Sequence, residues 1–108
     1  MTVVVSSPPK FDLGQVASTW NAEQQISDHI GMPLVMVLGE ILGRHVSGDW
    51  GEVCAEDKKI NDDAVKYGNR ILSAYDIRKP DDENDKLRVW VITEWDRSVT
   101  TILLPEDY

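Results

Sequence analysis

Cysteine, long apolar runs and secretory signals are scarce or absent in this sequence. One cysteine, Cys54, occurs in 108 residues, so the chain cannot form the internal disulfide framework of a small secreted domain. The longest apolar stretch, residues 32–38, includes a proline and is much shorter than the about 20 residues needed to span a bilayer. No charged start followed by an apolar segment occurs at the N-terminus, so we expect no signal peptide. These absences favour a cytoplasmic protein with no membrane segment.

Basic residues are also few. Lysine and arginine number 11, against 19 aspartate and glutamate residues, and the net charge is −8. Proteins that bind nucleic acid use Lys and Arg to neutralise phosphates, so this charge disfavours direct binding to DNA or RNA. An acidic surface suits a basic protein partner, and it also keeps a protein soluble without any partner. We therefore predict a protein partner, with solubility alone as the competing interpretation.

The composition is otherwise that of an ordinary globular domain. Hydrophobic residues make up 42% and charged residues 28% of a chain whose length is typical of one domain. Two serines and two prolines occur at positions 6–9, and they favour extended backbone over helix. We therefore predict a flexible N-terminal arm over residues 1–10 and a single domain over residues 11–108.

Apolar spacing predicts a strand and two helices in the first half of the chain. Residues 11–18 alternate roughly as a strand does. Asn21 is a candidate N-cap for a short helix that continues to Ile30. Pro33 suits the first position of a second helix, in which apolar residues recur at spacings of three and four. The second helix therefore has one apolar face with which to cover a sheet.

A third, more polar helix is predicted for residues 55–67. Gly68 follows it and is a natural C-terminal cap, because glycine adopts the left-handed conformation at low cost. Apolar residues three or four positions apart on a helix share one face. The predicted inward stripe of this helix consists of Ile60, Ala64 and Tyr67.

The last third of the chain is predicted to be β-structure. Strands are expected at 70–77, 87–95 and 99–104, with a polar loop at 79–86 and a tight turn at 96–98. One face of the central strand consists of Leu87, Val89, Val91, Thr93 and Trp95. Consecutive strands joined by short connections form an antiparallel meander, which helices must cover on one face. The predicted fold class is α+β, with an antiparallel sheet of three to four strands under two to three helices.

A first polar segment, residues 44–51, is a candidate binding site. It places His45, Asp49 and Trp50 at the junction between a helix and a loop. In one interpretation, His45 and Asp49 share a ligand or a proton, and in the other the segment is a structural turn. The structural interpretation has Trp50 filling the core and Asp49 capping the next helix, because these residue types are common in those roles.

A second polar segment surrounds the predicted turn between the last two strands. Glu94, Asp96 and Arg97 could hold an anionic ligand or a metal through a carboxylate pair and an arginine. The alternative is a turn stabilised by the Asp96 side chain, with Arg97 paired to a nearby acid.

Cofactor motifs are missing from the sequence. There is no Walker loop, no glycine-rich dinucleotide fingerprint, no HExxH and no nucleophile elbow. One cysteine and two histidines are too few for a Cys/His zinc cluster. We therefore predict no cofactor and assign no catalytic residue.

Several motifs carry a resemblance to a known family. They are Phe11-Asp-Leu-Gly-Gln-Val-Ala, Arg44-His45, Gly48-Asp49-Trp50-Gly51, Trp90-Val-Ile-Thr-Glu and Asp96-Arg97-Ser98. With these motifs the chain resembles a small bacterial family labelled plasmid-related protein, or type I restriction enzyme M subunit. The second label implies a methyltransferase, but the chain lacks the glycine-rich cofactor loop of such enzymes. The resemblance therefore implies an accessory role on mobile elements rather than an activity.

Three functions are compatible with the sequence. The first is a non-enzymatic accessory protein of plasmids or phages that binds another protein, with anti-restriction or anti-CRISPR activity as one form. The second is a small metal-dependent hydrolase or nuclease, in which His45, Asp49, Glu94 and Arg97 would converge. The third is a nucleotide-binding sponge, in which Trp50 and Trp90 stack a base and Arg97 binds a phosphate. Homodimerisation through an exposed sheet edge is compatible with all three.

Overall fold

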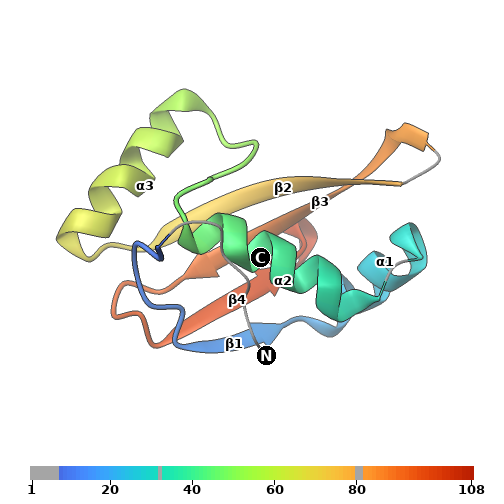
Figure 1. Cartoon of the computed structure of the whole chain (residues 1–108), viewed down its shortest axis with the longest axis horizontal. Helices are drawn as coiled ribbons and strands as arrows, with labels where there is room; N and C mark the ends of the chain where they lie inside the picture. Colours follow the sequence, from blue (N-terminus) through green and yellow to red (C-terminus); the bar gives the residue numbers. More distant parts are fainter. Residues whose placement is uncertain (1–7, 32, 80–81) are drawn as a thin grey trace.

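A computed structural model of the chain describes residues 8–31, 33–79 and 82–108. It is an α+β fold, as predicted, with three α-helices and a four-stranded sheet in the described part of the chain (Figure 1). The elements in chain order are β1 (Gln15–Ser18), α1 (Trp20–Ile30), α2 (Leu34–Val46), α3 (Ala55–Tyr67), β2 (Ile71–Lys79), β3 (Asp82–Thr93), β4 (Val99–Leu103) and the 3-10 helix η1 (Pro105–Asp107).

The sheet is mixed, with strand order β1-β4-β3-β2. The three C-terminal strands form the predicted antiparallel meander. However, β1 pairs parallel with β4, so the prediction of a wholly antiparallel sheet is wrong in this one strand. Short connections force neighbouring strands to run antiparallel. The chain between β1 and β4 is long and includes all three helices and the strands β2 and β3. The connection therefore leaves the direction of β1 to tertiary packing.

The helices begin close to their predicted positions, with small corrections. Thr19, rather than Asn21, is the N-cap of α1, and its side chain accepts a hydrogen bond from the Ala22 backbone N–H at 3.1 Å. Gly31 ends this helix in the left-handed conformation, with φ 68°. Pro33 is the N-cap of α2 rather than its first residue. Each correction shifts a helix start by one or two residues.

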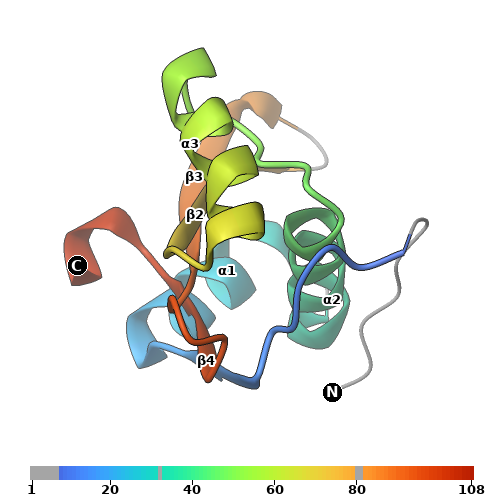
Figure 2. The same ribbon diagram turned by 90° about the vertical axis from the view of Figure 1, so that its left-hand side faces the viewer.

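The core lies between one face of the sheet and the helices α1 and α2. The predicted apolar face of α2 is buried there, and its members include Val37, Leu38, Ile41 and Leu42. They pack with Val89, Val91 and Ile102, which come from the two central strands. Figure 2 shows α2 on one side of the sheet and the C-terminal turn on the other. The prediction that helices cover one face of the sheet is confirmed.

The strand β3 differs from its prediction at both ends. It begins at Asp82, so most of the predicted polar loop 79–86 belongs to the β2–β3 hairpin, and residues 80–81 lie outside the described residues. The predicted face of Leu87, Val89, Val91 and Thr93 is directed inward, and Ile92 on the other face is buried as well. Trp95 lies beyond the end of the strand and is 67% exposed. The described polar residues near the end of the hairpin, Asp82, Asn84 and Asp85, are exposed beyond the core.

The helix α3 has the predicted bounds but a different inward face. Ile60 and Tyr67 are 54% and 74% exposed, whereas Asn61 and Ala64 are buried. The reason is the position of α3 at the edge of the sheet, beside β2. Asn61 pairs there with the backbone of Leu72, donating through Nδ2 to its carbonyl at 2.7 Å and accepting from its N–H at 3.2 Å. An asparagine thus occupies a position where apolar spacing predicted isoleucine.

The start of the chain approaches the body of the fold at Lys10. Its backbone N–H donates to the Val46 carbonyl at 2.8 Å. The first seven residues of the predicted flexible arm lie outside the described residues. Among the described helices, none is long and apolar enough to cross a membrane alone, and one bent pair, α1 with α2, meets that test in length and composition.

Candidate functional site

His45 is fully buried between α2 and the sheet. Its Nδ1 lies 2.6 Å from the Ser73 hydroxyl, and its Nε2 lies 2.9 Å from the Thr93 hydroxyl. The Thr93 hydroxyl lies 2.7 Å from that of Thr100, which donates to the Leu13 carbonyl at 2.7 Å. A chain of four hydrogen bonds therefore crosses the interior from β2 to the segment before β1.

The direction of this chain follows from its last member. A carbonyl only accepts, so the Thr100 proton points to Leu13, and Thr100 can accept only from Thr93. The Thr93 oxygen must then accept from His45 Nε2–H. Nδ1 of His45 is left as an acceptor for the Ser73 hydroxyl proton. His45 is thereby fixed as the neutral Nε2–H tautomer.

The electrostatics of His45 agree with a neutral ring. Burial, with a smaller contribution from the positive charge of Arg97, lowers the pKa of His45 to about 3. A Ser–His pair of this geometry is found in nucleophilic sites, but there a carboxylate orients the ring and stabilises its charged form. Here Thr93 takes that place, and Ser73 is as buried as His45. The pair can hold α2 against the strands β2 and β3. Because both side chains are buried, a substrate cannot reach them.

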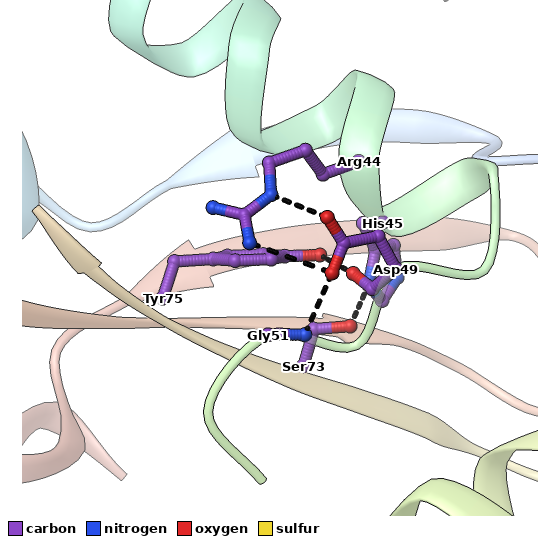
Figure 3. A network of polar contacts seen from close by, with 6 residues as sticks. All are labelled: Arg44, His45, Asp49, Gly51, Ser73 and Tyr75. Carbon is purple, nitrogen blue, oxygen red and sulfur yellow. Dashed lines mark hydrogen bonds and ion pairs between the residues drawn. The ribbon is translucent and has the colours of Figure 1, made fainter.

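Asp49 makes contacts that do not involve His45. Its carboxylate accepts from Arg44 Nε at 2.7 Å and from the Gly51 backbone N–H at 3.2 Å (Figure 3). These bonds, chiefly the one from Arg44, lower the pKa of Asp49. The Tyr75 hydroxyl donates to the Asp49 backbone carbonyl at 2.6 Å, and the Arg44 guanidinium lies 4.6 Å from the centre of the Tyr75 ring. Asp49 thus organises the loop after α2 rather than capping α3.

Trp50 fills the interior beneath that loop. Its exposed fraction is 4%, and its indole N–H donates to the Asp62 carboxylate at 2.9 Å. The indole stacks on Phe11 with ring centres 6.2 Å apart and meets His45 edge-on at 6.0 Å. The structural interpretation of this residue therefore accounts for its ring and its polar atom.

The second polar segment closes the β3–β4 turn. Asp96 is exposed and accepts from the Ser98 backbone N–H at 3.1 Å and from its hydroxyl at 2.6 Å, as in the predicted turn. Arg97 adopts φ 60° and donates to the carbonyls of Asn69 at 2.7 Å, Ala64 at 2.9 Å and Glu94 at 3.1 Å. Arg97 thus binds the carbonyl end of α3, and the acid partner predicted for it is replaced by backbone oxygens.

The two polar segments are neighbours, and Phe11 lies between them. Its ring centre is 5.2 Å from that of His45 and 5.5 Å from the Arg97 guanidinium carbon. A shallow depression of about 580 Å³ opens beside these residues and is lined mainly by the segment before β1, with Val46 and Arg97. The carboxylates of Asp49 and Asp96 bond within their own turns. The side chains of His45, Asp49, Trp50, Asp96 and Arg97 therefore bond to different partners. Glu94 takes part through its backbone, which donates to the Val99 carbonyl at 3.0 Å and accepts from Arg97.

Four contributors to this arrangement were missed from the sequence. Apart from its place in a resemblance motif, the sequence predicts only a strand position for Phe11, and it predicts ordinary strand positions for Ser73, Thr93 and Thr100. The one available signal was that Ser73 and Thr93 fall on inward strand positions, where a polar side chain needs a buried partner. His45 is that partner.

No group of three metal-ligating side chains occurs among residues 8–31, 33–79 and 82–108. Comparison of the chain with family models, curated proteins and solved structures finds no match. The resemblance to the plasmid-related family therefore stays a prediction.

Proposed function

We propose that the chain is a non-enzymatic protein-binding module and that its partner presents a basic surface. The binding surface is a stripe on α3 made of Glu56, Ile60, Asp63 and Tyr67. These residues are spaced four, three and four positions apart, so they line one side of the helix. All four are exposed. The resemblance described above adds the setting, an accessory protein of mobile elements that acts on a host or element-encoded protein.

The observation that carries this proposal is the exposure of Ile60 and Tyr67. Both are large apolar residues on a helix that is held to the body by Asn61, Ala64 and Val65. Burying Ile60 would remove apolar area from water, and the fold leaves that area exposed. An aromatic residue beside an aliphatic one, with acids at the rim, is a composition typical of protein interfaces.

Charge supports a basic partner for this surface. The helix α3 contains four acidic and three basic residues, and within the stripe both charged residues, Glu56 and Asp63, are acids. Complementary charge speeds the encounter of two proteins and excludes wrong partners. The acids at the rim of the stripe are therefore expected to set partner choice, and Ile60 and Tyr67 to supply affinity.

The competing enzymatic function has little support in this geometry. A hydrolase would need His45, Asp49, Glu94 and Arg97 to face one substrate. His45 is buried and neutral, and Arg97 is bonded to three backbone carbonyls. A nucleotide sponge would need an accessible Trp50, which is 4% exposed.

Site-specific photo-crosslinking in bacterial cells tests the proposal. A photoreactive phenylalanine replaces Ile60 or Tyr67 in turn, and Trp20 serves as the control because it is 76% exposed on a different helix. We expect the same crosslinked protein from positions 60 and 67 and not from position 20. Reversing the rim charges with Glu56→Lys and Asp63→Lys should abolish that product. Crosslinks that are equal at all three positions, or absent from both α3 positions, would overturn the proposal.

A further inference from the structure

The strand β2 lies at one edge of the sheet, and its backbone groups alternate in direction. Ala74 donates to the Trp50 carbonyl at 3.2 Å and accepts from the Glu52 N–H at 2.6 Å, so its backbone groups point away from β3. In an antiparallel pair every second residue points outward in this way. The outward-facing residues of β2 are therefore Leu72, Ala74, Asp76 and Arg78.

The first half of this edge is already occupied. The side-chain amide of Asn61 binds both backbone groups of Leu72, and the segment Trp50–Glu52 binds those of Ala74. Gly51 forms a parallel bridge with Ala74, so this segment runs beside β2 as a very short additional strand. Figure 1 shows the loop before α3 passing over this half of β2. The chain thus already adds a strand to β2 at one place.

The second half of the edge is open. No described residue forms a hydrogen bond with the backbone groups of Asp76 or Arg78. Unpaired edge groups are the feature to which a further strand pairs. The open half continues the line of the Trp50–Glu52 segment, and together they would give β2 a continuous neighbour.

A cavity adjoins this open edge on the side of α2. It has a volume of about 200 Å³. Half of its lining is apolar or aromatic, from Val37, Ile41, Tyr75 and Ile77, and the other half is charged, from Glu40, Arg44, Asp76 and Arg78. Cross-strand neighbours point to the same face of a sheet, so a residue paired with Ile77 would direct its side chain towards this cavity. The space suits one apolar side chain of an added strand.

The opposite face of the edge carries a cation, Arg78, beside a cluster of paired charges. Asp76 accepts from Arg88 at 2.8 Å and lies 3.5 Å from Lys86. Glu52 adds a second negative charge near Arg88. Arg78 is the cross-strand neighbour of Lys86, and no carboxylate of the described residues pairs with it. An acidic side chain paired with Arg78 would balance this charge.

We propose that the open half of β2 is a second binding site, which takes an extended segment of a partner protein as a fifth strand. Backbone hydrogen bonds to Asp76 and Arg78 hold the segment. An apolar side chain enters the cavity beside Ile77, and an acidic side chain next to it faces Arg78. The site is independent of the α3 stripe, because it is on a different element and selects the opposite charge.

Binding of a displayed library of ten-residue peptides, followed by amide exchange measured by NMR, tests this site. In the free protein the Asp76 and Arg78 amides should exchange fast, while those of Tyr75 and Ile77, which face β3, are protected. A selected peptide should slow exchange at Asp76 and Arg78 and should carry alternating apolar and acidic residues. N-methylation of the peptide should abolish binding at every second position only, because alternate amides face β2. Binding without this alternation would overturn the proposal.

Two substitutions at Arg78 separate the contribution of its backbone hydrogen bond to peptide affinity from that of its side-chain charge. Arg78→Pro removes the outward N–H, which an edge strand tolerates, and should weaken the selected peptide about tenfold. Arg78→Ala keeps the N–H and should weaken only peptides that contain the acidic residue. Equal affinities for wild type and Arg78→Pro would overturn the proposal. So would a dimer in analytical ultracentrifugation that itself protects the Asp76 and Arg78 amides, because a second copy would then be the occupant. Neither result bears on the crosslinks from α3.

Discussion

At the scale of single residues, His45 shows how a buried polar group specifies packing. Its ring touches side chains from β2 and β3, and through Thr93 and Thr100 it reaches the segment before β1. An unpaired buried donor or acceptor costs about 1–3 kcal/mol, so each member of the chain fixes the position of the next. A histidine supplies one donor and one acceptor on opposite sides of a flat ring, which two hydroxyls on neighbouring strands can use.

The pH dependence of stability should report His45. Its pKa falls from an ordinary 6.5 to about 3 on folding. The unfolded chain therefore binds a proton that the folded chain excludes between these values. The contribution of neutral His45 to the free energy of unfolding is fully present above pH 6.5. It is lost as pH falls towards 3, by up to about 1.4 kcal/mol per pH unit. Denaturant unfolding between pH 7 and 4.5 should show a smaller slope for His45→Gln than for wild type. An identical slope in both proteins would mean that His45 does not stay neutral.

At the scale of elements, the loop after α2 is positioned by the close approach of Gly51 to β2. A Cβ at Gly51 would collide with the Ala74 carbonyl and the Tyr75 ring, and the residue has φ 73°. The loop can therefore bond to the edge of β2 only if this residue is glycine. The same approach brings Asp49 beside Arg44 and Tyr75, so one glycine supports the whole loop.

Replacing Gly51 by alanine should be much more costly than the same change at Gly68. Both glycines have φ 73°, but a Cβ at Gly68 meets nothing within 4 Å. Gly68→Ala should therefore cost only the about 1–2 kcal/mol of a left-handed alanine. Gly51→Ala adds the steric collision and should lower the free energy of unfolding further. Chemical denaturation of the two variants measures the difference, and equal losses would show that the loop can move away from β2.

Another link at this scale joins α3 to the β3–β4 turn. Arg97 supplies donors to the carbonyls of Ala64 and Asn69 and to its own turn. A cation at the C-terminal end of a helix is favourable because it meets the negative end of the helix dipole. The helix that carries the proposed binding stripe is thereby fixed to the sheet at both Asn61 and Arg97.

At the scale of the whole molecule, the C-terminal turn is tied to the start of α1. Asp107 accepts from the Thr19 hydroxyl at 2.7 Å, from the Asn21 amide at 3.0 Å and from the Leu104 N–H at 3.0 Å. These bonds, led by the one from Asn21, lower the pKa of Asp107. The segment after β4 thus supports the helix that follows β1, next to the parallel pair of β1 and β4.

Asp107→Ala should lower the melting temperature at neutral pH. A carboxyl whose pKa falls on folding contributes stability above its ordinary pKa of 3.8 and loses it as pH falls further. The difference in melting temperature between wild type and variant should therefore be present at pH 7 and should shrink as pH falls below 3.8. Thermal unfolding followed by circular dichroism measures both. Glu106→Ala is the matched control, because no described residue bonds to that carboxylate, and an equal loss in the control would contradict the assignment.

Sequence patterns determined most of the elements of this protein. Periodic apolar residues placed the buried face of α2 and the alternation of β3, and glycine marked the ends of α1 and α3. These features depend on neighbours a few residues apart, so local spacing contains the information. The Asp96 turn belongs to the same class, because its hydrogen bonds span only two residues.

Only the tertiary structure decided the direction of β1, the inward face of α3 and the roles of His45 and Arg97. Each depends on partners far away in the chain: β4 for β1, Leu72 for Asn61, Thr93 for His45 and Ala64 for Arg97. A histidine or arginine in the sequence offers the same donors to a ligand as to the protein itself. Which of the two receives them depends on burial and on the backbone oxygens that folding brings near, and local spacing does not contain that information.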